Sequence, residues 1–215
     1  MSASGEQARG KFITLEGIEA VGKSTNLEFV AGLLRARGLS VLTTREPGGT
    51  RIGEELRDLL LNSAAGSVPD TAELLLMFAA RAAHLQQVIW PALARGDWVV
   101  CDRFTDASYA YQGGGRGLDD TTIDALREIV QGDFAPDLTL LLDASLAATE
   151  ARRAARGSTD RFEVEQAEFF NRVRAKYLQM AEREPARVIV VDASVTLEAV
   201  QSVLRSVVEQ FLDNE

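Results

Sequence analysis

The sequence has few of the residues on which several common kinds of site depend. It contains one cysteine and one histidine in 215 residues, so neither an intramolecular disulfide nor a zinc centre is expected. Its 23 basic side chains are outnumbered by 32 acidic ones, which argues against a nucleic-acid or anionic-membrane surface. No apolar run approaches the about 20 residues of a membrane span. These features predict a cytoplasmic protein without nucleic-acid or membrane partners.

The lone cysteine and the lone histidine are both expected to be structural. Cys101 ends an apolar run, which is typical of a buried, inert thiol, and His84 follows alanines on an expected helix without a partner set. The first ten residues are small and polar, and we expect a flexible extension over 1–10. Residues 11–215 are expected to form a single domain.

Five short apolar runs alternate with stretches of helical periodicity. Unbroken apolar strands are typical of a parallel sheet that is covered on both faces. The predicted fold is therefore α/β and doubly wound, with a five-stranded parallel sheet and helices on both faces. The expected strands span residues 11–16, 40–44, 97–101, 138–143 and 187–191.

A glycine-rich motif follows the first expected strand. Residues 17–24 read Gly-Ile-Glu-Ala-Val-Gly-Lys-Ser, which fits the phosphate-binding loop at every fixed position, between a strand and a helix. Its glycines let backbone N–H groups converge, and the helix N-terminus adds its positive dipole end. We expect Lys23 to reach the β- and γ-phosphates of a nucleotide and Ser24 to face Mg²⁺. The alternative, a glycine turn that binds nothing, is disfavoured by the flanking elements.

Charged or glycine-rich residues lie at the ends of the other strands. Ligands of such sheets bind beyond the carboxyl ends of the strands, so we expect one site built from 45–50, Asp102, Arg103, Asp143 and Asp192. For the last two, capping of a turn or helix is the alternative. Asp102 is a candidate metal ligand through water, and Arg103 is a candidate for holding the phosphate of an acceptor.

A second group of arginines surrounds Gly157. Clustered positive charge on a helix broken at a glycine predicts a closing lid at about residues 150–163, and the alternative is a solvated helix face. Phosphoryl transfer needs cations on the transferred oxygens, which these arginines could supply. A phosphate acceptor is already ionised at neutral pH and needs no catalytic histidine. The group comprises Arg152, Arg153, Arg156 and Arg161.

Together these segments resemble the bacterial thymidylate kinase family. The most specific are Arg-Glu-Pro-Gly-Gly-Thr at 45–50, Asp-Arg-Phe at 102–104 and Tyr-Gln-Gly-Gly-Gly-Arg-Gly at 111–117, in this order. The resemblance implies transfer of the γ-phosphate of ATP to dTMP with Mg²⁺, giving dTDP and ADP on the way to dTTP. It also implies a homodimer. The alternative is a phosphate-loop kinase for another nucleoside or nucleoside monophosphate.

The resemblance also implies roles for individual residues. The catalytic residues would be Glu19, Lys23, Arg103, Arg156 and Arg161. The ATP contacts would be Gly17, Ile18, Glu19, Ala20, Val21, Gly22, Lys23, Ser24, Thr25 and Arg152. The dTMP contacts would be Glu19, Arg45, Pro47, Arg57, Met77, Phe78, Arg81, Arg103, Ser108, Tyr111 and Gln112. The metal contacts would be Ser24 and Asp102.

Two points of the resemblance are specific to this chain. The family usually has a phenylalanine stacked on thymine where this chain has Met77, so either Met77 or its neighbour Phe78 packs the base. No basic residue lies at positions 19–21 of the loop. The chain therefore resembles the lid-arginine variant of the family. A GTPase-type switch is disfavoured, because its guanine-selecting Asn-Lys-x-Asp segment is missing from the sequence.

Overall fold

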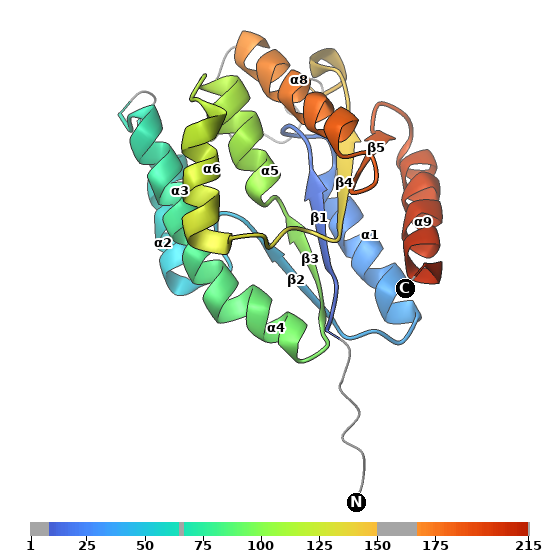
Figure 1. Ribbon diagram of the computed structural model, residues 1–215. Coiled ribbons are helices and arrows are strands. Elements are labelled where there is room, and N and C mark those ends of the chain that lie inside the picture. The colour runs from blue at the N-terminus through green and yellow to red at the C-terminus, as the bar shows by residue number, and fades with distance from the viewer. Residues whose placement is uncertain (1–8, 65–66, 150–166, 215) are drawn as a thin grey trace, which may run out of the picture.

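The computed structural model describes residues 9–64, 67–149 and 167–214 of the chain (Figure 1). The expected lid at about 150–163, with its four arginines, lies outside the described residues. So does most of the expected N-terminal extension. Its last two residues are described and pack on the domain: the N–H of Gly10 donates to the Leu93 carbonyl at 2.9 Å, and the Arg9 guanidinium lies 5.2 Å from the Phe134 ring centre.

The five predicted strands form one parallel sheet in the order β2-β3-β1-β4-β5, which confirms the predicted fold class. β2, β3 and β5 are displaced from the predicted ranges by a single residue, because each continues onto the charged residue that ends it, and β1 begins one residue later than predicted. The strands are β1 (Phe12–Glu16), β2 (Val41–Arg45), β3 (Trp98–Asp102), β4 (Leu138–Asp143) and β5 (Val188–Asp192).

Both faces of the sheet are apolar. Successive side chains of a strand point to opposite sides, and on these strands both sets are mostly apolar and buried. On β1, Ile13 and Leu15 belong to the larger buried cluster, which includes Val30 of the first helix. Phe12 belongs to the second cluster on the other face, with Leu85. This two-sided burial explains why the strands appear in the sequence as unbroken apolar runs.

Helices cover both faces of the sheet. Figure 1 shows α2, α3, α4 and α6 to one side of the strands and α1 and α9 to the other. None of the helices in the described ranges has the length and apolar character of a membrane span. The helices are α1 (Lys23–Ala36), α2 (Arg51–Asn62), α3 (Asp70–His84), α4 (Trp90–Ala94), α5 (Thr105–Ser108), α6 (Asp120–Gln131), α8 (Ala167–Arg183) and α9 (Leu197–Asp213), with π-helical segments η1 (Leu85–Ile89) and η2 (Tyr109–Gly115).

The strand order brings the carboxyl ends of β1, β2 and β3 together. β3 lies between β2 and β1, with Arg45 paired to Asp102 and Asp102 paired to Leu15 in register. Each of these three strands leads directly into a segment singled out from the sequence. They are the phosphate loop, residues 45–50 and the turn at Arg103.

Candidate active site

A cavity opens where β1, β2 and β3 end. Its walls come from the phosphate loop, the turn after β2, α2, α3, the end of β3, and the α5–η2 segment. The predicted site residues that line it are Glu19, Ala20, Gly22, Lys23, Ser24, Pro47, Arg57, Met77, Arg81, Asp102, Arg103, Ser108, Tyr111 and Gln112. Glu46 of the predicted segment 45–50 also lines it, and the lining residues that we did not predict are Leu61, Phe104 and Ala107.

The phosphate loop turns tightly, because several of its residues adopt left-handed backbone angles. Gly17, Ala20 and Gly22 have positive φ values of 132°, 60° and 94°. A Cβ atom on Gly17 would lie 2.3 Å from the Leu142 carbonyl oxygen, so a glycine is required there. No side chain of residues 9–64, 67–149 or 167–214 caps the N-terminus of α1 at Gly22, so its first-turn N–H groups can bind an anion.

Lys23 is buried at the start of α1. Its Nζ donates to the carbonyls of Gly17 at 3.2 Å and Ile18 at 2.9 Å. Burial lowers the pKa of the Lys23 ammonium to about 8, and the positive charge of Arg103 acts in the same direction. The carboxylates of Asp102, Glu19 and Glu16 oppose this shift only in part, and a phosphate group next to Lys23 would favour its charged form further.

Asp102 and Ser24 form an oxygen-rich part of the same cavity. The Oδ1 atom of Asp102 is buried and has no hydrogen-bond partner among the described residues. Ser24 contributes a hydroxyl group to the lining. Carboxylate and hydroxyl oxygens are hard ligands of the kind that Mg²⁺ takes together with phosphates and water. The two residues therefore fit the predicted metal position.

Arg81 reaches the cavity from α3 and is held by three acceptors. Its Nε donates to Oε2 of Glu46 at 2.8 Å, and its Nη2 donates to the Phe104 carbonyl at 3.1 Å and to Oγ of Ser108 at 3.0 Å. Its Nη1 is buried and has no hydrogen-bond partner among the described residues. A planar, immobilised guanidinium with a free N–H group is suited to bind a carbonyl oxygen.

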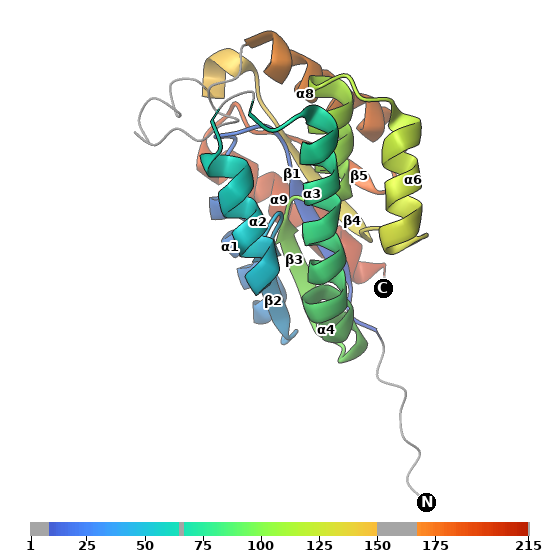
Figure 2. The same cartoon turned by 90° about the vertical axis from the view of Figure 1, so that its left-hand side faces the viewer.

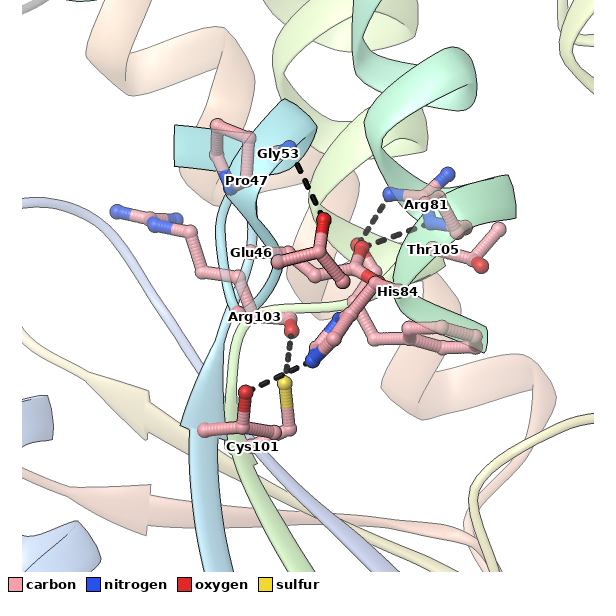
Figure 3. Close-up of polar contacts among 12 residues, drawn as sticks. Glu46, Pro47, Gly53, Arg81, His84, Cys101, Arg103 and Thr105 are labelled. Carbon is pink, nitrogen blue, oxygen red and sulfur yellow. Dashed lines mark hydrogen bonds and ion pairs between the residues drawn. The ribbon is translucent and has the colours of Figure 1, made fainter. Parts of the chain in front are cut away.

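Glu46 joins Arg81 to His84. Figure 3 shows both side chains converging on the Glu46 carboxylate. Nδ1 of His84 lies 3.0 Å from Oε1 of Glu46, and Nε2 lies 2.7 Å from the Thr44 hydroxyl. His84 is fully buried. It therefore has the structural position expected of it, although its partners could not be identified from the sequence.

Arg103, Glu19 and Tyr111 form a second hydrogen-bonded group in the cavity lining. Its Nη2 donates to Oε1 of Glu19 at 3.0 Å and to the Tyr111 hydroxyl at 3.1 Å. The Tyr111 hydroxyl lies 2.7 Å from both Glu19 oxygens. Burial raises the pKa of the Tyr111 hydroxyl well above its usual value, so it remains a neutral donor. The predicted catalytic pair of Glu19 and Arg103 thus forms a direct ion pair.

The two candidates for packing a base lie in different environments. Met77 lines the cavity. Phe78 is 2% exposed and packs in the core with Leu74 and Ile123. The Arg81 guanidinium lies 4.5 Å from the Phe78 ring centre, so Phe78 supports that arginine from the core side. The structure therefore points Met77, and not Phe78, toward the cavity.

The remaining predicted arginines differ in how close they lie to the cavity. Arg57 lines it and donates to the Pro47 carbonyl at 3.1 Å. Arg45 instead pairs with Glu54 at 2.6 Å and is half exposed outside the lining. The predicted loop residues Gly17, Ile18, Val21 and Thr25 also lie outside the lining.

The ends of β4 and β5 lie outside this cavity. Asp143 forms a two-point ion pair with Arg174 at 2.6 and 2.7 Å. Asp192 accepts from the N–H of Ser194 at 2.8 Å and caps a local turn. These two strand ends therefore do not contribute to the described cavity, and their carboxylates are engaged in local contacts, as the alternative of turn capping predicts for Asp192.

Sequence reasoning missed two buried groups behind the cavity. Glu16 ends β1 and is fully buried; burial raises its pKa to about 8, with a further contribution from Asp106. A charged residue at the end of an apolar strand was the signal available for it. Tyr177 on α8 gave no local signal, since an aromatic residue on a helix usually belongs to the core.

Cys101 is buried with a raised pKa, as expected of an inert thiol.

Comparison with known proteins gives the family of the chain. A sequence model described as thymidylate kinase matches residues 15–204. The chain belongs to the thymidylate kinase family. It is 55% identical to the thymidylate kinase of Pseudomonas syringae pv. syringae (strain B728a) over 204 residues, which cover 95% of this chain and 97% of that protein. It is 59% identical to the thymidylate kinase of Chromohalobacter salexigens over 195 residues, which cover 90% of this chain and 92% of that protein.

A solved structure agrees with this assignment. The crystal structure of thymidylate kinase from Ehrlichia chaffeensis is similar with a TM-score of 0.76 and 33% sequence identity, covering 94% of this chain and 99% of that chain. The resemblance to thymidylate kinases stated from the sequence segments is thus confirmed.

Proposed function

We propose that this member of the thymidylate kinase family transfers the γ-phosphate of ATP to dTMP, giving dTDP and ADP. The observation that carries the proposal is that one cavity contains both halves of the required site. Its lining includes Lys23 of the phosphate loop and Arg81, whose Nη1 has no hydrogen-bond partner within the described part of the chain. Arg103 also lines this cavity. The arrangement suits two phosphorylated ligands that face one another.

The thymine base is proposed to lie against α3 and η2. The free Nη1 of Arg81 would donate to a base carbonyl, while Ser108 and Gln112 offer further polar contacts. Met77 would pack on the ring with its polarizable thioether. Tyr111 is proposed to crowd the 2′ position of the ribose, which would favour a deoxyribose.

The phosphate of dTMP is proposed to bind to Arg103, with Arg57 and Arg45 on the same side. Arg45 would have to leave Glu54, and this is inexpensive because a half-exposed ion pair contributes only about 0–1 kcal/mol. Glu19 would then compete with the incoming phosphate for Arg103. Once the phosphate is aligned, one of its ionised oxygens attacks the γ-phosphorus, so no general base is needed.

ATP is proposed to bind with its phosphates on the loop amides and Lys23, and with Thr25 and Arg152 nearby. Ser24 would hold Mg²⁺ directly and Asp102 through water, and the ion would supply positive charge to the β- and γ-phosphates. Arg156 and Arg161 are proposed to neutralise the transferring group. The lid assigned to about 150–163 would bring them there.

The chain is also proposed to form a homodimer in the cytoplasm. Ile52 and Leu59 lie seven residues apart on one face of α2 and are 49% and 50% exposed, and Leu75 of α3 is 51% exposed. Figure 2 shows α2 and α3 side by side on the face toward the viewer. An apolar surface of this kind can be buried against its own copy about a two-fold axis.

A panel of acceptors tests the proposed reaction. Purified protein with ATP and Mg²⁺ should phosphorylate dTMP with a higher kcat/KM than dUMP, dCMP or AMP. Lys23→Ala should reduce turnover by orders of magnitude while the circular dichroism spectrum stays unchanged. Faster phosphorylation of another monophosphate would favour the alternative of a phosphate-loop kinase with a different acceptor. A Lys23→Ala variant of near-normal rate would refute the loop assignment.

A further inference from the structure

Glu16 is a buried carboxyl group for which the proposed reaction gives no role. It ends β1 without any exposed surface. Its Oε1 accepts from the N–H of Phe104 at 2.7 Å, and its Oε2 accepts from the Tyr177 hydroxyl at 2.6 Å. A carboxyl group is costly to bury, so its two hydrogen-bond partners indicate what it does in the fold. Both partners, the Phe104 N–H and the Tyr177 hydroxyl, connect Glu16 to Arg103.

The first connection runs through the backbone. Arg103 has a φ of 69°, a left-handed conformation that residues other than glycine rarely adopt, and strained residues of this kind cluster at functional sites. The bond from Phe104 N–H to Glu16 fixes the peptide group that follows this turn. The carbonyl of Phe104 in turn accepts from Nη2 of Arg81. The Glu16 carboxyl group therefore holds the turn that carries Arg103. The same turn contacts Arg81 through the Phe104 carbonyl.

The second connection runs through side chains. Nη1 of Arg103 donates to the Tyr177 hydroxyl at 3.3 Å and to the Gly17 carbonyl at 3.0 Å, and neither residue lines the cavity. Nη2 of Arg103 binds Glu19 and Tyr111, which do line it. The guanidinium is thus anchored from behind through Nη1, and Nη2 is the nitrogen on the cavity side.

We propose that Glu16 and Tyr177 are positioning residues that hold Arg103 in the orientation in which it binds the phosphate of the acceptor nucleotide. The proposal rests on the proposed function, since it takes Arg103 as the phosphate ligand. Neither residue touches the substrate. Tyr177 links Glu16 to Nη1, and chains of hydrogen bonds of this kind strengthen one another in a buried site.

Removal of a single hydroxyl group tests the proposal. Tyr177→Phe keeps the ring in the core and deletes the side-chain link between Glu16 and Arg103, while the backbone link through the Phe104 N–H remains. Tyr109→Phe is the matched control, because its hydroxyl donates to Asp124 and lies outside the cavity lining. Calorimetry should show dTMP binding about tenfold weaker in Tyr177→Phe, as expected for a lost hydrogen bond to a charged group. ATP affinity should stay within about twofold, and the control should bind both ligands normally.

A double-mutant cycle separates this role from a merely structural one. In an Arg103→Met background, Tyr177→Phe should cause no further loss of dTMP affinity, because its effect is exerted through Arg103. Glu16→Gln keeps an acceptor for the Phe104 N–H and should weaken dTMP binding in the same direction. Its thermal unfolding, recorded in parallel, shows that the variant is folded.

Three results would overturn the proposal. They are unchanged dTMP affinity in folded Tyr177→Phe and Glu16→Gln, an equal loss of affinity in the Arg103→Met background, and a parallel loss of ATP affinity. Turnover of dTMP by the unmodified protein is measured in the same series. If that turnover is absent, the proposed function fails; if it is present and the cycle is additive, only the positioning role fails.

Discussion

The buried ion pair between Arg81 and Glu46 allows a quantitative test of the site. Their side chains are 3% and 5% exposed and meet at 2.8 Å, so both charges are largely shielded from bulk water. Arg81→Met deletes the guanidinium and keeps an unbranched apolar chain, which leaves Glu46 with His84 alone. Loss of one partner of a buried pair costs about 3–5 kcal/mol. For a domain of this size we expect a fall in Tm of about 6–20 °C.

Glu46→Gln and the double variant complete the cycle. Glu46→Gln removes the carboxylate charge that faces Arg81 and weakens the contacts to Arg81 and His84. The free energy of unfolding should fall by about 1.5–3 kcal/mol. The double variant has no unpaired buried charge, so its loss should fall short of the sum by about 1–3 kcal/mol. Urea unfolding followed by circular dichroism measures the free energy of unfolding of the two single variants and the double variant. Arg51→Met is the control, because its pair with Glu55 is 95% and 64% exposed and should change stability by less than about 1 kcal/mol.

Either of two outcomes would contradict the prediction that Arg81 and Glu46 act as a buried ion pair. One is an Arg81→Met variant that loses less than about 1 kcal/mol, which would mean that the Glu46 charge is solvated without Arg81. The other is strict additivity in the double variant, which would mean that the two side chains do not act as a pair.

Three further predictions concern the metal site, the assembly and a buried acid. Asp102→Asn should raise the Mg²⁺ concentration for half-maximal turnover severalfold, and an unchanged Mg²⁺ titration would exclude Asp102 from the metal site. Leu59→Arg should convert the proposed dimer to a monomer in sedimentation velocity; a dimer that survives this charge would place the interface elsewhere. The raised pKa of Glu16 means that the folded protein keeps its proton between its ordinary value of 4.5 and about 8 while the unfolded chain releases it. Unfolding free energy should therefore fall as pH rises through this window in the unmodified protein but not in Glu16→Gln, and parallel curves for the two would contradict this.

Much of the fold could be predicted because its signals are local. The strands are apolar runs buried on both faces, and their predicted bounds were displaced by at most one residue at either end. The phosphate loop was equally clear, since the glycines at 17 and 22 meet a backbone requirement that the structure shows as positive φ angles. Both kinds of signal depend on neighbours in the chain.

What the sequence could not provide were contacts between distant segments. Tyr177 binds Glu16 across 161 positions, and no periodicity records such a pairing. Asp143 matched the pattern of a site residue, yet Arg174 on α8 neutralises it. The choice between Met77 and Phe78 depended on the rotation of α3 against the core, which is set by packing with Leu74 and Ile123 and not by the motif.

A crystal structure with dTMP and a non-hydrolysable ATP analogue would test the central claim most directly. We expect the triphosphate on the loop amides and Lys23, the dTMP phosphate on Arg103, and a thymine carbonyl on Nη1 of Arg81. Density for dTMP outside this cavity, or for the triphosphate away from residues 17–24, would contradict it.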